Sequence, residues 1–395
     1  MTEKQVSTYI HRPVVLLLLL CVWLPAAGQD VSLEVRTNSG RTEFHVGEVI
    51  LIDLVFTAYK SDTYRLTSGG ALPEKYPLRD VFLVEPVSGW EDPLGDYRNA
   101  LFKAETSGHF PIADSLMSSS IALSPKPYAL PSVVLNDYVT FSKPGVYTVQ
   151  VRDSRVMSTV ARIGTPSGRL TLASNPLELT IVPSDAKWQE ARLREALASL
   201  AELRQAIDSG AKSYRSSLAD GCITLRALGS NGAGAAMVDA VRDEALFSRC
   251  SFQVGLWEFP NKRFILDQMR ALLKDSEVAI SYTFFDTMAT TSLLADGHAD
   301  RLFARNPRKI DQVLEQQIVT FLPSKVGQAK FKTINTLVGI SFAKYGGTTG
   351  DLMRAPKKLS SLDSRVLQIA TDNFDDLSPS AQRTLRNYHK AQNRN

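Results

Sequence analysis

Residues 177–193, with the sequence LELTIVPSDAKWQEARL, join two parts of the chain that follow different periods. Up to Val182 apolar and polar residues alternate, which is the pattern of a half-buried strand. From Ser184 and Asp185 onward the apolar residues recur every three or four positions, as on one face of a helix, and both residues are of types that cap helix N-termini. We therefore predict a β-rich half before Pro183 and an all-helical half after it.

Strand patterns recur upstream of this junction. Short apolar or alternating runs, separated by turn residues, lie at Val31–Val35, Phe44–Val46, Val49–Phe56 and Val146–Val151. Several short strands with Gly and Pro turns between them favour an antiparallel β-sandwich. We predict that residues 29–183 form this sandwich and that residues 184–395 form the helical part.

The segment from about residue 60 to 135 is long for the middle of a sandwich. It contains eight prolines and scattered aromatic residues, among them Trp90. Because proline cannot donate to a strand ladder, we predict mostly loop here, with one strand at Val81–Val84. The aromatic residues have two alternative roles. In the first they pack the loops against the sheet, and in the second they are exposed and stack on sugar rings or contact a partner.

Two motifs in the β half carry a resemblance. Phe44-x-Val46-Gly47-Glu48 precedes an apolar run, and Phe141-x-x-Pro144-Gly145-x-Tyr147-x-Val149 lies downstream. Together they resemble an immunoglobulin-like bacterial sandwich. The resemblance implies that the hydroxyl of Tyr147 bonds back across a corner of the sandwich. The cysteine pair of antibody-type domains is absent from this half, so only the broad sandwich class is implied.

The helical half shows consecutive amphipathic segments without strands between them, which favours an α-solenoid. The first segment carries apolar residues on one face at Trp188, Leu193, Leu197, Leu200, Leu203 and Ile207. Met269–Asp275, followed by an amphipathic stretch from Val278 to Leu294, is similar to one HEAT-type repeat. The whole chain thus resembles secreted bacterial two-part proteins with an immunoglobulin-like sandwich before degenerate HEAT-like repeats, a resemblance that implies no particular activity.

The N-terminus has the order of a secretory signal. Lys4 and Arg12 precede the apolar run Val14–Leu24, and small residues follow up to Gly28. The apolar run of about 11 residues is shorter than the roughly 20 needed to cross a bilayer. We predict a signal peptide over residues 1–28, cleavage after Gly28, and a mature protein that is secreted or periplasmic.

Two cysteines remain after this cleavage, Cys222 and Cys250, both in the helical half. In an oxidising compartment they could form a disulfide, which would stabilise the fold by about 3–4 kcal/mol through loop closure. The alternative is two buried thiols on neighbouring helices. Neither cysteine has a histidine or second thiol close in sequence, so no metal site is predicted from them.

Other candidate sites are weaker. The net charge of +4 over 395 residues gives no reason to expect nucleic-acid binding. Asp296-Gly297-His298-Ala299-Asp300 could offer a cation two carboxylates and an imidazole, although a polar loop between helices explains the same residues. Gly229-x-x-Gly232-x-Gly234 is predicted to end one helix and start the next. We predict no cofactor, no metal and no catalytic residues.

These patterns favour an exported, non-enzymatic interaction or scaffold protein that binds a protein or peptide through the helical repeats and the sandwich loops. Two alternatives are kept. One is a carbohydrate-binding module that displays Trp90. The other is a hydrolase of cell-envelope polymer whose acid and base come from carboxylates in the long segment: Glu85, Glu91, Asp92, Asp96 and Glu105. Exposure of Trp90 and a converging acidic pair would distinguish these alternatives from the leading hypothesis.

Overall fold

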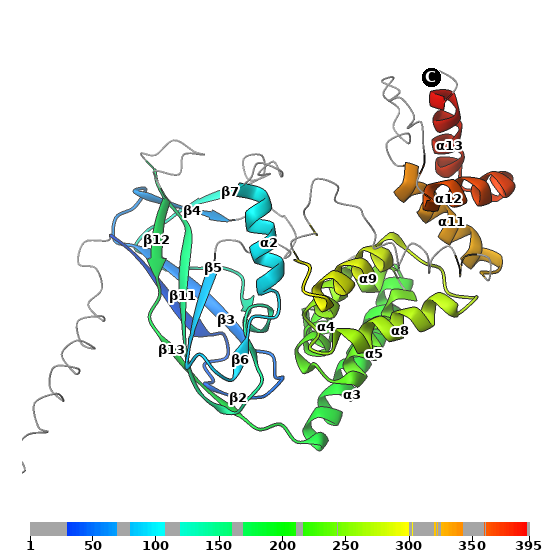
Figure 1. Ribbon diagram of the computed structural model, residues 1–395. Helices are drawn as coiled ribbons and strands as arrows, with labels where there is room; N and C mark the ends of the chain where they lie inside the picture. The colour runs from blue at the N-terminus through cyan, green and yellow to red at the C-terminus, as the bar shows by residue number, and fades with distance from the viewer. Residues whose placement is uncertain are drawn as a thin grey trace, which may run out of the picture.

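The computed structural model describes residues 30–68, 80–106, 119–159, 169–210, 216–242, 244–299, 302, 320, 322, 325–342, 359 and 361–392. Strands occupy the N-terminal part and helices the C-terminal part, as Figure 1 shows. The predicted change from strands to helices near residue 183 is therefore confirmed. The predicted signal peptide over residues 1–28 and its predicted cleavage site at Gly28 lie outside the described residues.

One sheet is built around β3 (Leu51–Ala58). β1 (Val31–Thr37) pairs with it antiparallel along its whole length, from Val31↔Ala58 to Thr37↔Ile52. The short strands β8 (Tyr128–Ala129) and β9 (Val133–Val134) pair with the other edge of β3. Every second residue of β1 is buried, so this sheet has one face in the core and one in solvent, as the alternating sequence requires.

The second sheet is built around the long strand β11 (Gly145–Ser158). Five strands of this sheet follow the order β2-β13-β11-β4-β7, with bounds Glu43–His45, Leu177–Val182, Gly145–Ser158, Tyr64–Ser68 and Ser119–Ala122. β5 (Asp80–Glu85) and β12 (Arg169–Ala173) also pair with β11. β2 runs parallel to β13, so the sheet is mixed, whereas the sequence predicted antiparallel pairing throughout.

A single hydrophobic core lies between the two sheets. Leu33, Leu54 and Phe56 enter it from the first sheet, and Val149 and Leu179 enter it from the second. These side chains are at most 5% exposed, so both sheets owe their stability to the apolar area that they bury against each other. A separate strand pair, β6 (Trp90–Glu91) with β10 (Thr140–Phe141), lies at one end.

The segment from about 60 to 135, where the sequence predicted mostly loop, forms strands or helix over most of its described residues. It supplies three strands of the second sheet (β4, β5 and β7), two of the first (β8 and β9), β6 and the helix α2 (Gly95–Thr106). Only the strand at Val81–Val84 was predicted, and it lies within β5. The other strands have two to five residues, too few to show a period, and pairing orders them: β8 and β9 with β3, β4 with β11, β7 with β4 and β6 with β10.

Tyr147 occupies the corner expected of it. Its hydroxyl oxygen lies 2.9 Å from the carbonyl oxygen of Lys143 and 3.1 Å from that of Gly89. The single hydroxyl proton can be donated to either acceptor, and the ring is 2% exposed. Tyr147 therefore ties the turn before β11 to the turn that follows β5.

The helical half begins with α3 (Ala186–Asp208). The carboxylate of Asp185 accepts a hydrogen bond from the backbone N–H of Trp188 and so caps this helix, as predicted. Further helices follow at Ser216–Leu228 (α4), Asn231–Asp239 (α5), Glu244–Arg249 (α6), Phe252–Glu258 (α7), Lys262–Lys274 (α8), Tyr282–Ala295 (α9), Gly327–Phe342 (α11), Ser361–Asp372 (α12) and Pro379–Gln392 (α13). Their apolar faces meet in one core. Within the described ranges, no helix combines the length and the apolar character that crossing a bilayer requires.

Cys222 and Cys250 form a disulfide in the structure. Cys222 lies on α4, and Cys250 directly follows α6. Their Cα atoms are 5.2 Å apart, and both residues are buried in the core of the helical half. The bond connects two neighbouring helices and closes a loop of 28 residues.

We expect the double variant C222A/C250A to be less stable than the wild-type protein by about 3–4 kcal/mol, because the unfolded chain loses its cross-link. Urea unfolding followed by circular dichroism measures this difference. A reducing agent should lower the wild-type midpoint and leave the variant unchanged. Two titratable thiols in the unreduced wild-type protein would contradict the bond.

Candidate functional site at the joint between the two halves

The two halves meet where the β2–β3 loop contacts the end of α4. Gly47, in this loop, has φ = 80°, a conformation that side-chain-bearing residues rarely adopt. A Cβ atom at this position would lie 3.3 Å from the carbonyl oxygen of Leu228 and 3.5 Å from that of Ala227. Glycine is therefore needed here twice, for the turn and for the close approach of the helix end.

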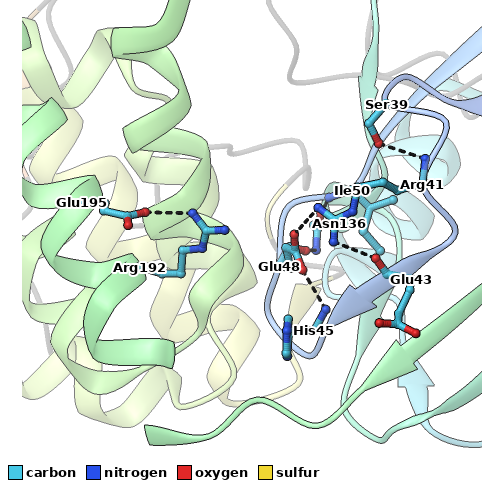
Figure 2. Close-up of polar contacts among 9 residues, drawn as sticks. All are labelled: Ser39, Arg41, Glu43, His45, Glu48, Ile50, Asn136, Arg192 and Glu195. Carbon is cyan, nitrogen blue, oxygen red and sulfur yellow. Dashed lines mark hydrogen bonds and ion pairs between the residues drawn. The ribbon is translucent and has the colours of Figure 1, made fainter. Parts of the chain in front are cut away.

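Polar contacts hold this loop in place on the β half (Figure 2). The carboxylate of Glu48 accepts hydrogen bonds from the guanidinium of Arg41 and from the backbone N–H of His45, both at 2.8 Å. Asn136 accepts a hydrogen bond from the N–H of Ile50 at 2.8 Å and donates one to the carbonyl of Glu48 at 3.0 Å. The loop is thus fixed before it meets the helices.

Aromatic side chains contact one another across the joint at two places. The imidazole of His45 stacks on the indole of Trp188 with ring centroids 4.7 Å apart, and its Nδ1 atom lies 2.9 Å from the carbonyl oxygen of Pro183. Tyr97 of α2 stacks on Trp257 of α7 at 5.3 Å. Tyr97 and Trp257 belong to a small buried cluster, separate from both cores, that also contains Leu94 and Val254.

An ion pair crosses the joint between these two aromatic contacts. A guanidinium nitrogen of Arg226, on α4, lies 2.5 Å from a carboxylate oxygen of Asp137, which belongs to the 3-10 turn η2 (Leu135–Asp137) of the β half. The same nitrogen lies 3.5 Å from a carboxylate oxygen of Glu258, the last residue of α7. The side chains of Arg226, Asp137 and Glu258 are 7%, 25% and 9% exposed. We call these three residues the joint cluster.

Further charged residues surround the joint cluster. Arg98 of α2 donates to the carbonyl of Asp137 at 3.1 Å, pairs with the carboxylate of Asp92, and lies over the ring of Tyr138. Lys262, in the first turn of α8, donates to the carbonyl of Phe259 at 3.3 Å. Cations from both halves therefore surround the carboxylates.

Burial changes the protonation of this region. Removal from water, with the nearby charge of Asp137, raises the pKa of Glu258 to about 8, although Arg226 opposes the shift. At neutral pH Glu258 is therefore mostly protonated. Burial lowers the pKa of Lys262 and also that of Arg98, and in both cases nearby carboxylates oppose the shift.

A small pocket borders the joint cluster. It is lined by both halves, at Val134, Asn136, Asp137, Thr140, Ile223, Arg226, Ala227, Gly229, Glu258 and Pro260. The space in it that is open to the centre of a water molecule is about 30 Å³, enough for no more than a water or two. Pockets for organic ligands are roughly ten times larger or more. This arrangement can hold the two halves together, but it cannot admit a sugar ring.

None of the carboxylates that the sequence offered for hydrolysis belongs to the joint cluster, although Glu91 and Asp96 lie near Lys262. Glu85, Glu91 and Asp96 are exposed on β5, β6 and the first turn of α2, and Asp92 pairs with Arg98. The side chain of Glu105 lies outside the described residues. Trp90 is half-buried against the core of the β half, and its indole N–H donates to the carbonyl of Pro86 at 3.0 Å.

The acidic pair that does converge is Asp137 with Glu258, which the sequence analysis did not identify. One signal was available. Glu258 is the single charged residue in the run Phe252–Phe259, and α7 is buried along Phe252–Trp257. A carboxylate in such a run is unfavourable unless it is paired or protonated. The position of Glu258 in the sequence therefore indicates a carboxylate with a special environment.

The remaining sequence candidates have structural roles in the described residues. Asp296 and Gly297 end α9, where Gly297 has φ = 70°, and Asp300 lies outside the described residues. Gly229 ends α4, and Gly234 lies against Phe259 in a space too small for a side chain. Across the part of the chain that the structure describes, no three His, Cys, Asp or Glu side chains are grouped so as to hold a metal ion.

No protein-family profile matches the chain, and a comparison with curated proteins finds no relative that matches it. The function of this chain is therefore inferred from its own geometry.

We expect G47A to lower stability more than G40A does. Both glycines have positive φ, so each alanine pays about 1–2 kcal/mol for its backbone conformation. A Cβ at Gly40 meets nothing within 4 Å, whereas one at Gly47 meets the helix end and should cost a further 1–3 kcal/mol or so. Urea midpoints of the two variants measure the difference. Equal losses would show that the loop does not touch α4.

We expect R226A to lower the free energy of unfolding by about 3–5 kcal/mol, because it leaves the partly buried carboxylate of Asp137 without its cation and removes the charge nearest to Glu258. The matched control is E195A, which breaks the exposed Arg192–Glu195 pair of α3 and should change stability by less than about 1 kcal/mol. Chemical denaturation of both variants tests this. An effect of R226A no larger than that of E195A would mean that the joint cluster is solvated.

Proposed function

We propose that this chain is an exported, non-enzymatic interaction protein. In this proposal the β half is an immunoglobulin-like sandwich, the helical half is a HEAT-like α-solenoid, and together they present a surface to a protein or peptide partner. The protein would act in the periplasm or outside the cell after removal of residues 1–28. Neither half would need a cofactor for this role.

The observation that carries the proposal is that the joint is filled by side chains of the two halves that contact one another. Its charged side chains contact one another across the two halves, and the pocket beside them has room for no more than a water or two. Buried charge here holds two parts in a fixed relation, as in an inter-domain interface. A composite surface of this kind binds a partner with little loss of freedom, because its parts are ordered beforehand.

The β half also presents apolar side chains to solvent. Val87 is 83% exposed in the turn after β5, and Val146 is 55% exposed near the start of β11. The backbone of this turn is fixed, since Gly89 accepts from Tyr147 and Pro86 accepts from the indole of Trp90. Aliphatic groups exposed on an ordered turn are suited to contact with a partner.

A hydrolase remains the second candidate because the joint cluster contains two carboxylates that face one guanidinium nitrogen. Acid–base pairs in glycosidases likewise consist of one ionised carboxylate and one whose pKa is raised. In this chain, however, Arg226 lies between the two groups and Glu258 is buried. A polymer could reach them only if the halves separated.

We expect the purified protein to capture a protein partner from an envelope or culture-supernatant extract. V87D in the β half and L197D on α3 should each weaken capture about tenfold or more if their surfaces take part, because each places a charge on an exposed aliphatic position. Quantitative mass spectrometry of the captured proteins measures this.

Both substitutions are on the surface, so the urea midpoints should remain close to that of the wild type, which serves as the folding control. Retention on insoluble polysaccharide with no captured protein would contradict the interaction proposal and favour a sugar-directed function.

A further inference from the structure

Glu258 is the least well accommodated charge of the joint. Its Oε2 atom lies 3.5 Å from Arg226, whereas the carboxylate of Asp137 is 2.5 Å from the same nitrogen. Its Oε1 atom is buried and accepts no hydrogen bond from the described residues. Arg226 thus pairs mainly with Asp137. It compensates only part of the negative charge that an ionised Glu258 carries.

The charged groups that face Glu258 come from four elements. Arg226 extends from α4, Asp137 from η2, Arg98 from α2 and Lys262 from α8. The nearby carboxylates of Glu91 and Asp96 act on Lys262, and Asp92 pairs with Arg98. The cations nearest to Glu258 therefore also compensate other carboxylates. A proton on Glu258 removes the negative charge that these cations leave uncompensated.

We propose that protonation of Glu258 controls the joint: the two halves are held together when this carboxyl group carries a proton and are loosened when it ionises. The geometry supports this, because Glu258 lies beside the ion pair that crosses the joint and directly follows Trp257, which stacks across it. This inference goes beyond the proposed function and holds whether or not a partner binds.

The direction of the pH effect follows from proton linkage. In the closed joint the pKa of Glu258 is about 8, whereas a solvated glutamate has its ordinary pKa of 4.5. Between these two values the closed state binds more protons than the open state, so the closed state loses stability as pH rises. The opening equilibrium should therefore increase by up to tenfold per pH unit in this window. It should level off above pH 8 and below pH 4.5.

Hydrogen–deuterium exchange between pH 5 and pH 9 tests the proposal. Exchange rates, corrected for their intrinsic pH dependence, are compared between the joint segments 94–100 and 252–259 and the core strand 51–58. In the wild-type protein the protection of the joint segments should fall as the pH rises to about 8, while that of the core strand stays constant.

The variant E258Q has the shape of the protonated side chain and should keep the joint protected at every pH. E195Q, which removes an exposed charge on α3, should behave like the wild type. E258Q retains the other titratable groups of the joint, including His45. If E258Q showed the same pH response as the wild type, the response would belong to one of those groups and the proposal would be overturned. A constant wild-type profile would overturn it as well.

If E258Q does not fold, the variant D137N provides a second test of the proposal. The charge of Asp137 is one of the causes that raise the pKa of Glu258, and its removal also leaves Arg226 to pair with Glu258. The loss of protection in D137N should therefore level off at a lower pH and be smaller in total than in the wild type. An unchanged or upward-shifted profile would contradict the proposal.

Discussion

The ion pair between Asp137 and Arg226 is the constraint on which the arrangement of the two halves depends. It joins the 3-10 turn of the β half to α4, and Arg226 is almost fully buried. Buried ions are costly to remove from water, so this pair favours assembly only while both partners meet and Glu258 does not add an uncompensated charge. Gly47 and the two aromatic stacks provide further contacts across the same interface.

This interface combines two kinds of contact with different physical behaviour. The cluster of Leu94, Tyr97, Val254 and Trp257 contributes non-directional apolar burial, which varies little with pH. The joint cluster contributes directional contacts that depend on protonation. The order of a surface that spans both halves is therefore limited by the least stable contact between them. This dependence links the proposed interaction role to the proposed proton control of the joint.

The sequence predicted what depends on local pattern and missed what depends on long-range pairing. The change of period at Pro183 and the cap at Asp185 were visible because each is encoded within a few residues. β4 and β7 were not, since strands of four or five residues carry no clear period and pair only in the folded sheet. The joint cluster was missed because Asp137 and Arg226 are 89 residues apart and neither stands out alone. Only Glu258 carried a local signal, as a single acid in an apolar run.

The central position of β11 has a consequence for biosynthesis. This one strand is the partner of β4, β5, β12 and β13, two of which precede it in the chain and two of which follow. Until residue 182 has left the ribosome, the second sheet lacks the strands needed to close it, and the first sheet lacks the surface that covers it. Contacts so distant in sequence form slowly. A chain that stops before Gly145 would therefore leave β5 without its partner strand.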